Sequence, residues 1–221
     1  MNPLELVLFD VNETVFSLDR LARRLADEGL ADGSLTLWFT RILRDGFALT
    51  AVDDSPAFKE LALAHLRTLL REAEQDPDRA ESILSTFSEL EAHADVAPAF
   101  ARLAEAGVRI VTLTNGHAEM TETLLQRNEL DGYVERALSV DEAGIWKPRA
   151  EAYTWAVERC GAELGTTAMV AVHSWDVDGA KRAGLRTGYC TRLEGGFIRL
   201  FTAPDVVGDD LVAVVDGLLA M

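Results

Sequence analysis

Two patterns of hydrophobic and polar positions follow each other along the chain. Short apolar runs, several rich in β-branched residues, are typical of buried parallel strands; they cover residues 4–9, 108–114, 136–140, 168–172 and 186–190. Segments with apolar residues at helical spacing separate or follow these runs, at residues 98–107, 117–130, 149–161, 177–184 and 209–220. Repeated strand–helix units of this kind predict a parallel sheet with helices on both faces.

A long block with mostly helical signals interrupts this alternation after the first strand. Four helix candidates, most with a Ser or Pro near their start, lie at residues 17–29, 34–46, 55–73 and 77–93. The block is too long to be a loop. We therefore predict an α/β fold with a Rossmann-like doubly wound parallel sheet core (residues 1–15 and 95–221) and a helical cap domain (residues 16–94) inserted after the first strand.

Composition narrows the classes of partner. Acidic residues outnumber basic ones 37 to 21, and the net charge of −16 argues against non-specific binding to nucleic acid or to an anionic membrane. Cys160 and Cys190 have no metal-ligand spacing, so we interpret them as reduced thiols of a cytoplasmic protein. The first residues lack a basic region and a long apolar run, so we expect no signal peptide and no membrane span.

Chemically active side chains follow the predicted strands. In open parallel sheets, ligands bind beyond the carboxyl ends of the strands. The residues next to these ends, or at the start of the following helix, are Asp10, Thr14, Thr114, Asn115, Lys147, Tyr153, His173, Trp175 and Asp176. We expect them to converge. Lys147 would keep Asp10 ionised, as a carboxylate nucleophile requires.

Four short motifs carry a family resemblance. In order, "FDVNET", "LTNG", "KPRAEAY" and "HSWDVDGA" resemble the four motifs of the haloacid dehalogenase superfamily, over nearly the whole chain and with the helical insert between the first two. The spacing of Lys147 and Tyr153, and the Trp175-Asp176 pair, are similar to the type II 2-haloacid dehalogenases. That resemblance implies a small 2-haloacid as substrate, no metal, no cofactor and a homodimer as the candidate assembly.

The resemblance also implies a mechanism. Asp10 would displace halide from the substrate to give an ester, and water would then hydrolyse that ester. Lys147 and Tyr153 would fix Asp10. The residues implied to contact substrate or halide are Asn12, Thr14, Arg41 on the cap, Thr114, Asn115, Tyr153 and Trp175.

Two departures from the family pattern concern water activation. Asn12 stands where a tyrosine is usual, and His173 ends a segment that usually reads Ser-Ser-Asn. Our hypothesis is that Glu13 orients His173, which deprotonates the attacking water. The family's usual assignment gives that role to Asp176, and both alternatives stay open.

Two other functions remain as alternatives. One is a magnesium-dependent phosphatase of the same superfamily; Asn12 in place of the second aspartate argues against it. The other is a non-catalytic relative that binds a small acid. The phenylalanines of the cap, Phe39, Phe47 and Phe58, are interpreted as core residues and left outside the site.

Overall fold

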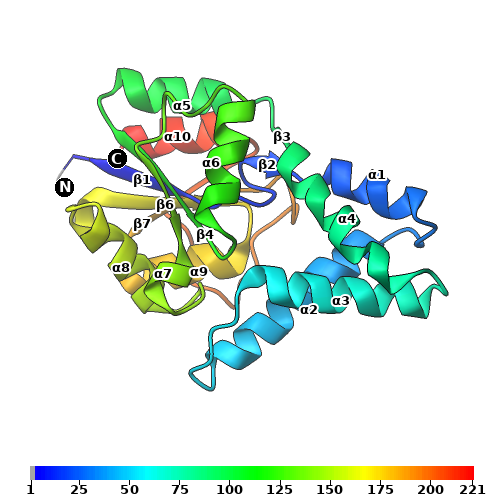
Figure 1. The fold of residues 1–221 in the computed structure, drawn as a ribbon. Coiled ribbons are helices and arrows are strands. Elements are labelled where there is room, and N and C mark those ends of the chain that lie inside the picture. The colour runs from blue at the N-terminus through cyan, green and yellow to red at the C-terminus, as the bar shows by residue number, and fades with distance from the viewer. Residues whose placement is uncertain (1–2) are drawn as a thin grey trace.

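A six-stranded parallel sheet forms the centre of the protein. The computed structural model describes residues 3–221 (Figure 1). The strand order is β5 (Arg136–Ser139), β4 (Arg109–Thr114), β1 (Leu6–Phe9), β6 (Thr167–Ala171), β7 (Arg186–Cys190) and β8 (Val206–Gly208). Every residue of β1 is buried, because the strand lies between two others and is covered on both faces.

Helices cover both faces of this sheet, as the sequence predicts. The chain moves from β1 to one side of the sheet and later to the other, and right-handed crossovers then place helices on opposite faces. One face carries α5 (Val96–Glu105), α6 (Ala118–Arg127) and α10 (Leu211–Leu219), and the other carries α8 (Ala150–Arg159) and α9 (Ser174–Ala183) (Figure 1). The predicted doubly wound α/β fold is confirmed.

Four helices follow β1 and lie to one side of the sheet in Figure 1: α1 (Asp19–Asp27), α2 (Ser34–Thr50), α3 (Phe58–Glu72) and α4 (Ala80–Leu84). These helices and their connections, residues 18–90, are called the cap below. The chain leaves through β2 (Phe16–Ser17) and returns through β3 (Glu91–Ala92), which pair antiparallel. The cap is therefore attached to the rest of the chain through this antiparallel pair of strands.

Residues 77–93 form several short pieces instead of the predicted single helix. They are the 3-10 turns η1 (Pro77–Arg79) and η2 (Ser85–Glu89), with α4 between them and β3 after them. The hydroxyls of Ser82, Ser85 and Ser88 each donate to the carbonyl oxygen three residues earlier. Such local bonds compete with a regular helix, which explains the break.

Helix α2 continues past Gly46, where the sequence predicted its end. A Cβ atom at Gly46 would lie 2.3 Å from Cζ3 of Trp146. The glycine is therefore needed for a close approach between the cap and the segment before α8. The short α7 (Val140–Ala143) and the edge strand β8 were also not predicted.

Both cysteines are free and buried. Within residues 3–221, the helices are too short or too polar to cross a bilayer.

Candidate active site

Asp10 lies directly after β1, at the carboxyl edge of the sheet, and is about 5% exposed. Its backbone N–H donates to Val170 O of the adjacent strand at 3.0 Å. The chain then turns sharply through Glu13, whose φ of 62° lies in the left-handed region. That turn brings the Thr14 hydroxyl back, so that it donates to Asp10 Oδ2 at 2.7 Å. The carboxylate is thus fixed by its own loop.

Lys147 holds two carboxylates together. Its Nζ is fully buried and donates to Asp10 Oδ1 at 2.9 Å, to Asp176 Oδ2 at 2.7 Å and to the carbonyl oxygen of Leu113 at 2.8 Å. All three ammonium protons therefore have acceptors. A buried charge is tolerated when it is paired and hydrogen-bonded in this way.

The charges around Asp10 keep it ionised. Burial acts to raise the pKa of Asp10, but the charges and hydrogen bonds of Lys147 and His173 outweigh it and hold the pKa below its usual range. Burial raises the pKa of Asp176, against the opposing effect of Lys147. Burial acts to lower the pKa of Lys147, but the two carboxylates raise it overall. A carboxylate in this setting is available as a nucleophile at neutral pH.

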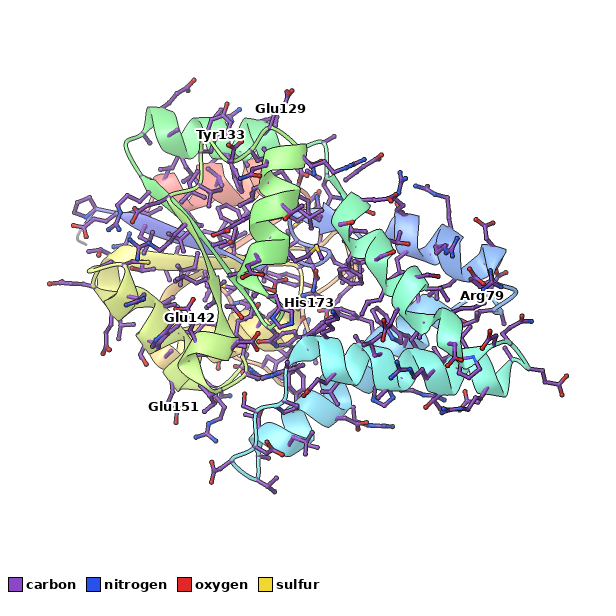
Figure 2. The ribbon with its side chains drawn as sticks, viewed as in Figure 1. Arg79, Glu129, Tyr133, Glu142, Glu151 and His173 are labelled. Atoms are coloured by element: carbon purple, nitrogen blue, oxygen red, sulfur yellow. The ribbon has the colours of Figure 1, made fainter. Side chains whose placement is uncertain are left out.

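His173 precedes the first turn of α9 and contacts Asp10 directly. Its Nδ1–H donates to Asp10 Oδ2 at 3.1 Å. The ring stacks on Trp175 and on Phe39 of α2, with centroid distances of 5.3 and 6.1 Å. Burial acts to lower the pKa of His173, but the hydrogen bond and charge of Asp10 raise it overall. Figure 2 shows the ring where the cap meets the sheet.

The predicted pairing of Glu13 with His173 is wrong. Nδ1 of His173 bonds to Asp10, and its buried Nε2 has no hydrogen-bond partner among residues 3–221. The left-handed turn places the Glu13 carbonyl oxygen against His93 Nε2, at 2.9 Å. The Glu13 carboxyl is partly buried, and burial raises its pKa. Glu13 acts on His173 through its charge alone.

Arg41 does not lie where the resemblance placed it. Its Nη1 pairs with Glu72 Oε2 of α3 at 3.1 Å. Two residues along a helix turn the side chain by about 200°, so Arg41 points away from the face of α2 that carries Phe39. Phe39, not Arg41, contacts the side chains at the strand ends.

Tyr153 reaches Asp176 instead of Asp10. Its hydroxyl lies 2.5 Å from Asp176 Oδ1 and 3.0 Å from the Asp176 carbonyl oxygen, and the side chain is fully buried. Burial and the nearby carboxylates raise the pKa of Tyr153 well above its ordinary value, so the phenol keeps its proton. Within residues 3–221, the Tyr153 hydroxyl bonds to Asp176, and the predicted bond to Asp10 does not form. Tyr153 positions Asp176.

Thr114 is the last residue of β4, and Asn115 follows it directly, as expected. Asn115 Oδ1 accepts from Lys147 N at 3.0 Å, and its Nδ2 donates to Lys147 O at 3.3 Å. Thr114 Oγ1 accepts from Gly116 N at 2.9 Å. The asparagine therefore fixes the backbone of Lys147. Trp175 lies beside the same lysine, with its ring centroid 6.0 Å from Nζ.

A cavity of about 660 Å³ borders the site. Asn12 lines it from the first strand end, and Thr114 and Gly116 line it from the second. Its remaining walls come from α3, α4, η2 and α6. No group of three or more His, Cys, Asp or Glu side chains placed to hold a metal ion occurs within residues 3–221.

Comparison with known proteins assigns the family. A family model described as "haloacid dehalogenase-like hydrolase" matches residues 4–184. The chain is a haloacid dehalogenase-like hydrolase.

The hydrolase resembles a curated relative and solved structures over most of their lengths. It is 28% identical over 191 residues to (S)-2-haloacid dehalogenase 4A of Burkholderia cepacia, covering 85% of this chain and 83% of the relative. A solved dehalogenase with intermediate complex is 26% identical, with a TM-score of 0.87 and coverage of 96% and 95%. The L-2-haloacid dehalogenase of Xanthobacter autotrophicus with chloropropionic acid covalently bound shares the fold, at 19% identity, a TM-score of 0.88 and 99% coverage of both chains.

Sequence reasoning missed the aromatic residues that the hydrolase contributes from its cap. Phe39 stacks on His173, Phe47 meets the edge of Trp175 at 5.0 Å, and Phe58 contacts Phe39 at 6.3 Å. Phe39 and Phe47 are eight residues apart in α2, which places them on one helix face. That spacing was a usable signal, but apolar residues at helical spacing equally indicate a core.

Proposed function

We propose that this hydrolase is a metal-independent dehalogenase of short 2-haloalkanoic acids that works through an ester on Asp10. The observation that carries the proposal is the ionised, nearly buried Asp10 carboxylate, bonded to Lys147, Thr14 and His173 at the carboxyl end of β1. The names of the relatives, and the covalently bound chloropropionic acid in the Xanthobacter enzyme, support a halogenated acid as substrate.

In the first step, an Asp10 oxygen attacks the carbon that carries the halogen, and the halide leaves with the bonding electron pair. Two cationic side chains, Lys147 and the His173 imidazolium, contact Asp10 from different sides. They keep the carboxylate ionised and hold it in place for the attack. Asn12, Thr114 and Trp175 would contact the substrate, because they border the same space or pack on His173.

In the second step, water attacks the carboxyl carbon of the ester and regenerates Asp10. Alkylation removes the Asp10 charge that raises the pKa of His173, so the imidazolium releases its proton to solvent. Nδ1 is then a neutral base next to the ester and takes a proton from the attacking water. Asp176 is the alternative base, but Lys147 and Tyr153 already bind its two oxygens.

We also infer that residues 16–94 act as a cap domain on a core of residues 1–15 and 95–221. The paired strands β2 and β3 form the attachment. Phe39 and Phe47 place aromatic surface of the cap against His173 and Trp175. Closure of the cap would exclude water from the first step and protect the ester from other nucleophiles.

Halide release tests the function. Purified protein is assayed with L- and D-2-chloropropionate and fluoroacetate in the presence of EDTA. The wild type is compared with Asp10→Asn and with Asp178→Asn, a control whose carboxylate bonds Arg182 outside the site. We expect release by the wild type and the control, and none by Asp10→Asn. Magnesium-dependent hydrolysis of p-nitrophenyl phosphate without halide release would instead favour the phosphatase.

A burst experiment separates the two candidate bases. His173→Gln keeps a hydrogen-bonding side chain but lacks the base, so we expect one equivalent of halide per site followed by slow turnover. Asp176→Asn disturbs Lys147 and therefore slows both steps without a burst. Wild-type turnover by His173→Gln would rule out His173 as the base.

A further inference from the structure

The 660 Å³ cavity shares its inner wall with the catalytic loops. Val11 and Asn12 follow Asp10 in the chain, and Thr114 and Gly116 flank Asn115; all four line the cavity. Phe58 connects the two spaces, because its ring contacts Phe39 beside the site and Phe87 inside the cavity, both at 6.3 Å. The cavity therefore lies directly beside the loops that carry Asp10 and Asn115.

The cavity is larger than a two- or three-carbon acid requires. Volumes of roughly 300–1,000 Å³ are typical of pockets that enclose drug-sized ligands. Much of the wall is apolar, with Leu63, Leu84, Phe87, Met120 and Leu124 contributed by the cap and α6. These elements lie next to each other on the side of the sheet where the cap is attached (Figure 1).

The charged groups of the lining do not favour a second carboxylate. Lys59 is the cation of the described lining, whereas Glu81 and Glu119 are acidic. His117 also borders the cavity, and its Nδ1 lies 2.8 Å from an Asp141 oxygen. A dianionic substrate would therefore meet more negative than positive charge there.

We propose that the cavity binds an uncharged hydrocarbon tail of the substrate, so that the enzyme prefers 2-haloacids with a medium-length alkyl or aryl group over the shortest acids. This inference rests on the proposed dehalogenase function and extends it. The carboxylate and the halogen-bearing carbon stay beside Asp10, and the hydrocarbon tail extends between Asn12 and Gly116 toward Met120.

A chain-length series tests the tail site. Initial rates of halide release are measured with L-2-bromopropionate, 2-bromobutanoate, 2-bromohexanoate, 2-bromooctanoate and 2-bromoadipate. Burial of one methylene contributes about 0.8 kcal/mol, which is about a fourfold gain in kcat/KM when the group is fully buried. We expect at least a tenfold rise from 2-bromobutanoate to 2-bromooctanoate, and a lower value for the dianionic 2-bromoadipate than for 2-bromohexanoate.

Two tryptophan variants make the test specific to the cavity. Leu84→Trp fills it, whereas Leu200→Trp places the same change on a side chain that is 91% exposed and outside the cavity. We expect Leu84→Trp to reduce kcat/KM for 2-bromooctanoate at least tenfold, with 2-bromopropionate changed less than twofold. Leu200→Trp should resemble the wild type with both acids. Met120→Trp, which fills the cavity from α6, provides a second variant if Leu84→Trp folds poorly.

The outcomes distinguish failure of the tail site from failure of the proposed dehalogenase function. Highest kcat/KM with 2-bromopropionate, falling as the chain lengthens, would overturn the tail site and leave the dehalogenase function intact. An equal loss with short and long acids in the filling variants would also overturn it. No halide from any acid would overturn the dehalogenase function on which the inference rests. In that case, unchanged binding of 2-hydroxyoctanoate by Leu84→Trp in a calorimetric titration would exclude the tail site independently.

Discussion

Gly46→Ala should disturb the active site through the cap, although Gly46 touches none of the reacting groups. The added Cβ would lie 2.3, 2.6 and 2.7 Å from three ring carbons of Trp146. Favourable carbon–carbon contacts are about 3.5–4.0 Å, so helix or ring must move by about 1 Å or more. Trp146 has little freedom, because it is fully buried and its Nε1–H donates to Pro56 O at 2.9 Å.

The expected loss of stability follows from overpacking around Trp146, and the expected loss of activity follows from the position of Lys147, the next residue in the chain. Overpacking of a dense core costs about 1–3 kcal/mol, so we expect a loss of that size in the free energy of unfolding. Trp146 precedes Lys147, whose Nζ lies 2.9 Å from Asp10 Oδ1. A displacement of about 1 Å in a catalytic group costs up to about a hundredfold in rate, so kcat/KM should fall about 10- to 100-fold.

Urea unfolding and halide-release kinetics measure the two effects. Gly132→Ala is the matched control, because no atom of the described part of the chain lies within 4 Å of its added Cβ. The double variant Gly46→Ala/Trp146→Phe should lose less stability than the sum of its single changes, since the smaller ring gives the methyl space. Unchanged stability and activity in Gly46→Ala would refute the close contact between α2 and Trp146.

Three further predictions concern charges. Arg41→Ala removes an exposed ion pair with Glu72, so the free energy of unfolding should change by about 0–1 kcal/mol. The value of kcat/KM should change less than threefold. A large loss of kcat/KM would show that Arg41 acts in the active site. Lys147→Met leaves buried carboxylates without their cation and should cost about 3–5 kcal/mol in urea unfolding, with activity lost; retained activity would contradict its role. Asp10 raises the pKa of His173, so the stabilisation from this contact is complete below the unfolded pKa of about 6.5 and is lost as pH rises through the higher folded value. The difference in unfolding free energy between wild type and His173→Gln should therefore shrink as pH rises above about 6.5.

Sequence periodicity predicted the sheet and the positions of several site residues for a simple reason. The carboxyl ends of parallel strands meet at one edge, so Asp10, Thr114 and His173 had to lie near each other once their strands were identified. The contact between Lys147 and Asp10 was expected from charge, since a buried carboxylate needs a partner. The structure shows that contact at 2.9 Å.

The errors concern side-chain direction, which local pattern does not determine. Arg41 and Phe39 are two residues apart, and only tertiary packing decides which of them faces the sheet. Tyr153 has the expected spacing from Lys147, yet its hydroxyl reaches Asp176 because α8 packs against α9. The turn at Glu13 requires a left-handed backbone conformation. A glycine at this position would have indicated such a turn, but the sequence has a glutamate there.

The measurement that tests the central proposal most directly follows the oxygen atom during a single turnover. Enzyme in molar excess over L-2-chloropropionate reacts in water enriched in ¹⁸O, and mass spectrometry examines lactate and the peptide that contains Asp10. If Asp10 forms the ester, the first-turnover lactate hydroxyl carries ¹⁶O from the carboxylate, and Asp10 acquires one ¹⁸O. Lactate labelled with ¹⁸O in that turnover, together with an unlabelled Asp10 peptide, would show direct attack by water and contradict the nucleophilic role of Asp10.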